Sequence, residues 1–464
     1  MKLKRLLALF IAFALLTAAS VCAVSAAAPE GAEILDMYSP WAAWDIFMAE
    51  TIYGLGNEGT YSNFTGGFTD GKFLPVRESL AEKFFSGAAS GTMDDDPVTR
   101  GEVVSALYEI IADALGIESE LSPIDYFIEN GLINGRASGD YQLDQRCTTE
   151  EMIAFSVRVY EYLSYALELD TKGLFWQITG EGLPNTVYLL GTIHTGDASI
   201  YPFSKLMMKS FDDAEYLGVE ANVYTMSEEE LDYLIEGQMI RDGKTIKDFI
   251  SEETYELYKQ VAESFGMTAE VYDYIKPWAA ALAIQNAMAS DDSMSSSLGM
   301  DMFFLAKAVS FGKNIVEIES VKYQIDMFNS YSNELQEVLL LSAIVPPPPE
   351  EGEEALSAED MAELNRMFTA YLLEAVKTGD EAALTEILMA GRDYSDPLSA
   401  EYNTKLWDIR NAAMAEAVER YLAAEDAGGD FFVAVGAGHT VGPDGIVETL
   451  RSKGYTVVFL GGIK

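Results

Sequence analysis

The spacing of apolar and polar residues changes character once along this chain, near residue 170. Before that point, from about 33 to 168, apolar residues recur at helical spacing in two similar halves. From Gly173 onward, short apolar runs rich in β-branched and aromatic residues alternate with longer amphipathic segments. The pattern therefore predicts a small all-α domain at 33–168 and an α/β domain at 174–464, with a mixed, largely parallel sheet flanked by helices.

The second domain is predicted to begin with a β-hairpin, because L-F-W-Q-I-T (174–179) and T-V-Y-L-L-G (186–191) flank E-G-L-P-N. Further strands are expected at 216–219, 314–319, 431–435 and 455–460. Helical spacing predicts helices at 227–238, 252–265, 277–289, 301–311, 358–377, 381–389, 400–424 and 445–453. Prolines followed by acidic residues at 346–354 predict an exposed loop.

Four apolar runs of the second domain each lead to a polar residue at or just past their carboxyl end. These residues are His194, Glu220, Glu319 and His439. In open α/β sheets, ligands bind outside the carboxyl ends of the strands. If the four runs belong to one sheet, two imidazoles and two carboxylates meet at one edge, and we expect a site there.

His194 and His439 are the only 2 histidines among 464 residues, and each is the fourth residue of a Gly-x-x-His segment. A single histidine after a strand is more often structural, but two in the same frame favour a functional pair. Two imidazoles with one or two carboxylates can hold a divalent metal with an open position. The same groups without a metal can act as a general base and its orienting partner.

Three further residues have two interpretations each. Glu319 alternates with Glu317, so that one of the two is expected to face solvent. Asp197, in H-T-G-D, either supports the site or belongs to a turn. Arg410 lies on the predicted helix 400–424, where it either reaches the site as an anion holder or faces solvent. The buried stripe of that helix is predicted to contain Tyr402, Leu406, Ile409, Ala413, Ala417 and Tyr421.

The charge of the chain excludes two classes of partner. Its 30 basic and 75 acidic residues give a formal net charge of −45, spread along the sequence. Such a surface repels nucleic acid phosphates and anionic lipid headgroups. The apolar fraction of 49% indicates packed globular cores rather than disorder.

The N-terminus predicts an exported protein. Basic residues precede an apolar run at 6–16, and V-S-A at 24–26 offers a cleavage site, which together indicate a signal peptide at 1–26. A lipid anchor on Cys22 is not expected, because Val21 matches a lipobox poorly. No later stretch reaches transmembrane length. Cys147 would be the only thiol after cleavage, which excludes an internal disulfide and a cysteine metal site.

In the helical domain, each half opens a helix with a threonine followed three residues later by glutamate, the capping-box signature. These pairs are Thr99 with Glu102 and Thr148 with Glu151. The segments V-T-R-G-E (98–102) and C-T-T-E (147–150) resemble the helix starts of S-layer homology repeats in bacterial surface proteins, and about two repeats are visible. The resemblance implies binding to cell-wall polysaccharide. A plain helical spacer is the alternative.

Residues 174–464 resemble the TraB/GumN family, which includes the Tiki proteases and is distantly similar to erythromycin esterases. The resemblance is carried by Y-L-L-G-T-I-H-T-G-D (188–197), G-V-E-A-N (218–222), R-N-A-A-M-A (410–415) and V-G-A-G-H-T (435–440). It implies a hydrolase that depends on Mn²⁺ or Co²⁺, with Zn²⁺ as a further option. Carried over, His194, Glu220 and His439 are ligand or acid/base candidates, and Glu319 and Arg410 support the site.

The leading hypothesis is thus an exported metallohydrolase, similar to a peptidase, that acts on a peptide or another small acyl substrate. A second hypothesis is a surface protein that binds and sequesters a peptide signal or a metal without turnover. A third is a metal-free esterase.

Overall fold

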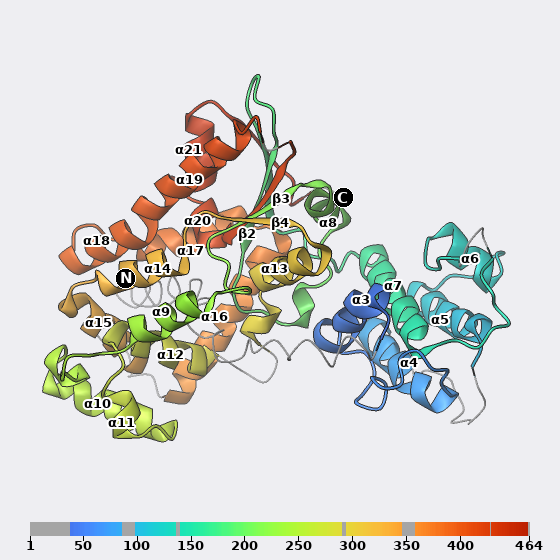
Figure 1. The fold of residues 1–464 in the computed structure, drawn as a ribbon, viewed down its shortest axis with the longest axis horizontal. Helices are drawn as coiled ribbons and strands as arrows, with labels where there is room; N and C mark the ends of the chain where they lie inside the picture. Colours follow the sequence, from blue (N-terminus) through green and yellow to red (C-terminus); the bar gives the residue numbers. More distant parts are fainter. Residues whose placement is uncertain are drawn as a thin grey trace. The chain divides into compact units, whose positions relative to one another are not determined.

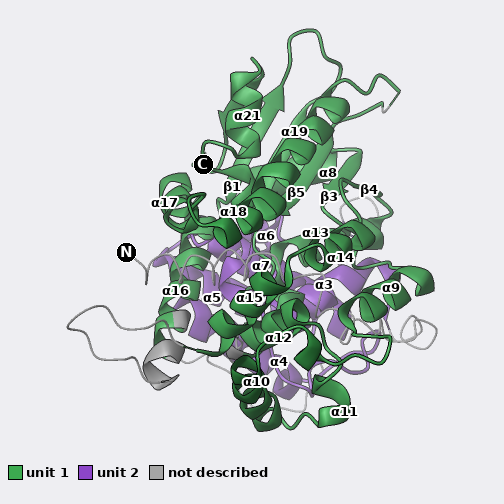
Figure 2. Cartoon of the chain, turned by 90° about the vertical axis from the view of Figure 1, so that its left-hand side faces the viewer, with its two compact units in different colours: residues 1–26, 172–197, 205–464 green, residues 27–171, 198–204 purple. Residues whose placement is uncertain are grey.

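The computed structural model describes residues 38–85, 98–135, 140–289, 294–345, 358–426 and 428–462. Within these residues it has two compact units, shown separately coloured in Figure 2. Unit 2 contains residues up to 171 together with 198–204, and unit 1 contains the remainder. The predicted signal peptide and the proline-rich loop at 346–354 lie outside the described residues.

Unit 1 is built on a six-stranded sheet with the order β4-β3-β5-β2-β1-β6. Strands β2, β5, β3 and β4 run parallel, whereas β1 is antiparallel to both β2 and β6. The predicted hairpin and the mixed, largely parallel sheet are therefore confirmed. The strands are β1 Leu174–Thr179, β2 Val187–Thr192, β3 Tyr216–Val219, β4 Asn314–Glu317, β5 Phe431–Gly436 and β6 Thr456–Phe459.

Helices cover both faces of this sheet (Figure 1). Phe431 and Phe432 are neighbours in β5, so their side chains point to opposite faces. Phe432 packs on Phe304 of α13 (Met300–Phe311), with ring centroids 4.8 Å apart. Phe431 stacks on Tyr421 of α19 (Ile409–Leu422) at 4.6 Å. Burial of such aromatic side chains between the layers holds the sheet and its helices together.

Most of the remaining helices of unit 1 are close to the predicted ones, and α11, α14, α15 and α20 are additional. They are α8 Lys205–Asp213, α9 Glu228–Gln238, α10 Glu252–Ser264, α11 Ala269–Tyr272, α12 Pro277–Ala289, α14 Val321–Asn329, α15 Asn333–Ile344, α16 Ala358–Thr378, α17 Glu381–Gly391, α20 Ala437–Thr440 and α21 Ile446–Ser452.

The helix predicted at 400–424 is present, but it is not a regular α-helix throughout. The segment forms α18 (Pro397–Asn403), a π-helical turn at Thr404–Asp408 and then α19. A π turn inserts one residue, which rotates everything beyond it by about 100°. Beyond the turn the predicted buried stripe is wrong in part: Ala417 is buried as predicted, but Ile409 is 51% exposed and Ala413 is exposed, while Arg410 is fully buried.

In unit 2, both predicted capping boxes are present, at Thr99 for α5 (Arg100–Leu115) and at Thr148 for α7 (Thr149–Ala166). A third threonine, Thr69, precedes α4 (Asp70–Phe84). Isolated bridges Gly67↔Thr148 and Thr99↔Arg146 link these helix starts. The sequence pattern missed the third start because Lys72 occupies the position where the others have glutamate. Unit 2 also contains η1 Pro40–Ala42, α3 Ala43–Phe47, a π turn at Met48–Ile52 and α6 Pro123–Glu129.

None of the helices in the described part of the chain has the length and apolar character that crossing a membrane requires.

Candidate functional site at the carboxyl edge of the sheet

The sheet brings the four polar residues predicted at strand ends to one edge. Thr192 pairs with Gly436 across β2 and β5, and Val219 pairs with Ala434 across β3 and β5. The carboxyl ends of β2, β5 and β3 therefore lie next to one another at the same edge of the sheet. His194 lies two residues beyond β2, Glu220 follows β3 directly, and His439 lies in the short helix α20 that follows β5.

Three of these side chains converge around Gly436. A Cβ atom at this glycine would lie 3.1 Å from Oε1 of Glu220, 3.6 Å from Nε2 of His194 and 3.6 Å from Cδ2 of His439. Nε2 of His439 is 4.0 Å from Oε1 of Glu220. A side chain at this position would therefore enter the space into which the three polar groups point, and Glu220 would have to shift slightly to admit it.

Each imidazole is oriented by a partner that the sequence analysis did not select. Nδ1 of His194 is 3.0 Å from Oδ1 of Asp301, and Nδ1 of His439 is 2.6 Å from Oδ1 of Asn411. Asn411 donates its Nδ2 to the backbone oxygen of Asp444, which fixes its oxygen toward His439. Asn411 accepts a hydrogen bond from Nδ1 of His439, and the Asp301 carboxylate faces Nδ1 of His194 as an ion-pair partner, so the Nε2 atoms are the nitrogens left for a ligand.

The sequence indicates these two partners, Asp301 and Asn411, only weakly. Asp301 is a lone carboxylate in the apolar run G-M-D-M-F-F-L, and it is 8% exposed. Asn411 directly follows Arg410 and is 1% exposed. A polar residue in a buried helical position requires a partner, but the identity of that partner depends on segments far away in the chain.

A buried ion-pair network holds Glu220 in place. Arg410 donates Nη2 to Oε2 of Glu220 at 2.6 Å, and it contacts Glu319 through Nε at 2.8 Å and Nη2 at 2.9 Å. The backbone N–H of Gly436 donates to the other oxygen of Glu220 at 2.6 Å. Burial opposes the charged carboxylate, but Arg410, the two imidazoles and this N–H outweigh it and lower the pKa of Glu220 to about 2.

The two imidazoles have pKa values shifted in opposite directions. Burial and the nearby Arg410 guanidinium lower the pKa of His439 to about 3, so this ring is neutral at physiological pH. Burial also favours neutral His194, but the adjacent Asp301 carboxylate outweighs it and raises the pKa of His194. The site therefore combines an imidazole that is neutral at physiological pH, His439, with one that gains a proton more readily than a free histidine, His194.

Some expectations for the supporting residues are corrected by the structure. A solvent-facing Arg410 is wrong, because the side chain is fully buried and its guanidinium is engaged by two glutamates. Glu319 is the buried member of its pair, with a side chain 4% exposed, whereas Glu317 is exposed and accepts from the backbone N–H of Asn222. Asp197 lies in the turn after β2 and does not line the site cavity.

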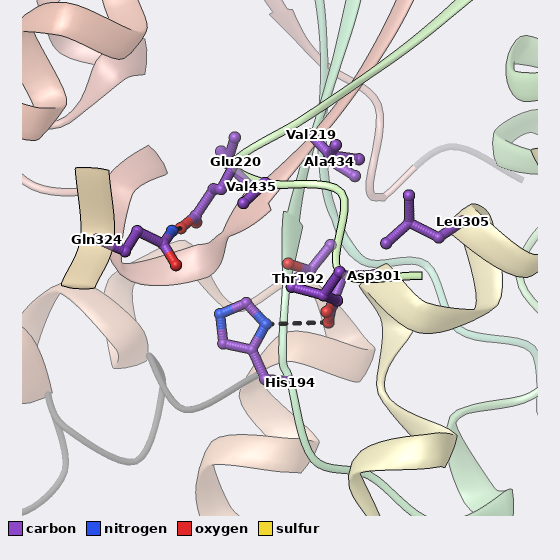
Figure 3. A pocket seen from close by; sticks show the side chains of 11 residues that line it. Thr192, His194, Val219, Glu220, Asp301, Leu305, Gln324, Ala434 and Val435 are labelled. Carbon is purple, nitrogen blue, oxygen red and sulfur yellow. Dashed lines mark hydrogen bonds and ion pairs between the residues drawn. The ribbon is translucent and has the colours of Figure 1, made fainter. Parts of the chain in front are cut away.

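A small cavity of about 30 Å³ lies beside His194 and Glu220. Its polar lining comes from Thr192, His194, Glu220, Asp301 and Gln324, and the rest of the lining is mostly apolar (Figure 3). This volume has room for a single water molecule or ion.

The donor set at Gly436 fits a divalent ion. Nε2 of His439 is buried and has no hydrogen-bond partner, which leaves a lone pair directed into the site. Two donors bound about 2.1 Å from one metal are at most about 4.2 Å apart, and the separation from Glu220 Oε1 is 4.0 Å. Within the described ranges, no group of three His, Cys, Asp or Glu side chains stands close enough together to hold a metal ion without some movement of the side chains.

A sequence model of the TraB/PrgY/gumN family matches residues 174–458, more than half of the chain. The chain belongs to the TraB/PrgY/gumN family. The match covers β1 to β5, all but the last residue of β6, both Gly-x-x-His segments and the buried Arg410. The site is thus contained within the family domain, whereas the part of unit 2 up to residue 171 lies outside it.

Relatives of this TraB/PrgY/gumN-family protein are distant. An uncharacterized protein of Treponema pallidum (strain Nichols) is 23% identical over 290 residues, which cover 60% of this chain and 80% of the relative. The uncharacterized protein YbaP of Escherichia coli (strain K12) is 24% identical over 140 residues, which cover 30% of this chain and 50% of YbaP. YbaP of Shigella flexneri matches to the same extent. No solved structure matches the chain significantly.

Proposed function

We propose that this TraB/PrgY/gumN-family protein is a divalent-metal-dependent hydrolase that acts on a peptide or another small acyl substrate. The observation that carries the proposal is the buried Nε2 of His439, which has no hydrogen-bond partner and lies 4.0 Å from Oε1 of Glu220. An unsatisfied buried nitrogen costs free energy, on the order of 1–3 kcal/mol. Its presence beside a carboxylate and a second imidazole favours a bound ion.

In this proposal the ion would be held by Nε2 of His194, Nε2 of His439 and Oε1 of Glu220. When bound, it supplies a water of lowered pKa and polarises the substrate carbonyl. Mn²⁺, Co²⁺ and Zn²⁺ all suit mixed imidazole and carboxylate donors.

The chain's own residues have distinct parts in the proposal. Glu220, with a pKa of about 2, is a weak proton acceptor at neutral pH and serves as a charged ligand rather than a general base. Arg410 does not line the cavity and acts by holding Glu220 and Glu319. Asp301 and Asn411 aim the two imidazoles, as outer partners of metal-binding histidines do.

The test uses the full chain, stripped of metal with a chelator and then supplied with Mn²⁺, Co²⁺ or Zn²⁺. Products from a peptide library are followed by mass spectrometry, and metal binding is measured by calorimetry. His194→Ala and His439→Ala should each lose at least about 100-fold in hydrolysis and in metal affinity. The control is Gln285→Ala, a buried polar residue of α12 outside the site.

Two outcomes would overturn the hydrolase proposal. Tight metal binding with no product from any substrate would indicate a protein that sequesters a metal or a peptide signal. Hydrolysis that survives exhaustive chelation would indicate a metal-free esterase, in which the two histidines act on the substrate directly.

For unit 2 we propose attachment to cell-wall polysaccharide. A pocket of about 320 Å³ is lined by Trp41, Arg100 and Arg158 among others. Trp41 is 54% exposed and offers a flat apolar surface for a sugar ring. Arg100 is held by Glu151 at 2.5 Å, so its position is fixed. Together with export by the predicted signal peptide at 1–26, this would place the hydrolase at the cell surface.

A further inference from the structure

The cavity beside the site has the size of one water molecule. Its volume of about 30 Å³ is too small for an amino-acid side chain. A buried water is bound only where two to four polar groups surround it. Two of the polar side chains that line this cavity, Thr192 and Gln324, are not among the residues proposed to hold the metal.

Thr192 supplies a hydroxyl that has no partner in the protein. It is the last residue of β2 and is completely buried, and its Oγ1 makes no hydrogen bond. Figure 3 shows this hydroxyl pointing toward the side of the cavity where Glu220 and Gln324 lie. A buried hydroxyl without a partner is costly, whereas valine would fill the same volume without that cost.

Gln324 supplies an acceptor of fixed orientation. It belongs to α14 and is 8% exposed. Its Nε2 donates to Oε2 of Glu319 at 3.1 Å and to Oε2 of Glu220 at 3.3 Å. Because carboxylates only accept hydrogen bonds, the amide nitrogen must face them and the amide oxygen must face away. Figure 3 shows this oxygen on the side of His194.

We propose that the cavity binds the water molecule consumed in hydrolysis, and that Thr192 and Gln324 orient it. This inference rests on the proposed hydrolase function. The water donates one hydrogen to Oε1 of Gln324 and accepts one from Oγ1 of Thr192, which leaves a lone pair free. In the reaction the water oxygen bonds to the substrate carbonyl carbon and the bond from that carbon to the leaving group breaks. The leaving group takes the proton that the water loses.

Two variants of the full chain test the proposal, with Thr254→Val as a control at a buried threonine of α10. Thr192→Val and Gln324→Met should each lower kcat at least about 10-fold, with KM within about twofold of the unsubstituted protein. A role in folding alone would instead lower the melting temperature and spare kcat. Thr192→Val should leave the melting temperature nearly unchanged or raise it, because its hydroxyl makes no hydrogen bond to another protein group.

A crystal structure provides a readout that does not need a substrate. The inference is supported by a water within hydrogen-bond distance of both Thr192 Oγ1 and Gln324 Oε1. The electron density of this water should be weaker in Thr192→Val. Absence of that water, or an unchanged kcat in Thr192→Val, would overturn it. If the unsubstituted protein cleaves nothing, the hydrolase proposal fails and so does the reactive role, whereas an ordered water would still support the binding site.

Discussion

Nε2 of His439 lies 4.0 Å from Oε1 of Glu220, although the two residues belong to segments far apart in the chain. The contact exists because β3 lies directly beside β5 in the sheet, with Val219 paired to Ala434. Parallel strands end at the same edge, so the residues that follow them meet there. Four predictions concern this edge and the helix that carries Arg410, and a fifth concerns unit 2.

Arg410→Met should lower the free energy of unfolding by about 3–5 kcal/mol. The substitution removes the guanidinium that pairs Glu220 and Glu319, and it leaves two carboxylates buried without that counter-charge. Urea denaturation measures the change. Arg420→Met, at an exposed position of the same helix, should change it by less than about 0.5 kcal/mol. A loss under about 1 kcal/mol in Arg410→Met would show that the network is not needed for stability.

Replacing the two histidines should change the pH dependence of stability in opposite directions. The pKa of His439 is about 3 in the folded protein and about 6.5 when unfolded. The unfolded state therefore binds the extra proton between these values, and stability falls as pH decreases. The slope from this residue is at most about 1.4 kcal/mol per pH unit. His194 has a raised pKa, so its contribution is present below its unfolded pKa and is lost as pH rises through the folded one.

Urea denaturation of chelator-treated protein between about pH 8 and pH 5 separates these effects, because His194 acts above the unfolded histidine pKa of about 6.5, His439 acts below it, and Glu220 contributes mainly below this range. Below about pH 6.5, His439→Gln should lose less stability on acidification than the unsubstituted protein. Between about pH 8 and 6.5, His194→Gln should gain less stability on acidification than the unsubstituted protein. Identical slopes in both variants would contradict the assignment of one neutral and one protonatable ring. Gln285→Ala serves as the control.

Gly436→Ala should fold but lose affinity for Mn²⁺ or Co²⁺ by at least about 10-fold. The added methyl group would lie 3.1 Å from Oε1 of Glu220 and 3.6 Å from Nε2 of His194, within the space between the ligands. Calorimetry measures the affinity. Gly71→Ala, where the nearest atom is 3.9 Å from the new methyl group, is the matched control. Unchanged affinity in Gly436→Ala would place the metal elsewhere.

Deletion of Thr404 should rotate α19 by about 100°, because the π turn loses its additional residue and becomes α-helical. Arg410 and Asn411 then leave the interior, and Ile409 enters it. We expect a loss of more than about 3 kcal/mol in unfolding free energy, measured by urea denaturation. Thr404→Ala keeps the residue count and should stay within about 1 kcal/mol. Equal effects of the two changes would rule out the phase shift as the cause.

Trp41→Ala should reduce binding of the full chain to purified cell walls by at least about 10-fold in a sedimentation assay. The expected loss follows from removal of the exposed aromatic surface of the unit 2 pocket. The control is Tyr371→Ala, which removes an exposed aromatic side chain from α16 in unit 1. Wall binding that does not respond to Trp41→Ala, or no wall binding by the unsubstituted chain, would leave unit 2 as a spacer.

The local pattern of the sequence was sufficient for most elements of unit 1. Apolar runs located the strands, and their carboxyl ends located His194, Glu220, Glu319 and His439. The paired Gly-x-x-His segments distinguished the two histidines from other polar residues at strand ends. Capping boxes at Thr99 and Thr148 located two helices of unit 2. These features depend on residues within a few positions of one another, and periodicity records such neighbours directly.

Only the tertiary structure decided how these pieces act together. The π turn at Thr404–Asp408 decided between the two interpretations of Arg410, because it turns this side chain into the interior. Composition alone does not reveal a one-residue change of helical phase. Asp301 and Asn411 became imidazole partners through packing of helices that follow different strands. The sequence by itself determined which residues stand at the ends of strands. Strand order and the pairing of buried charges between distant segments determined which of them form a site, since those contacts depend on packing rather than on local spacing.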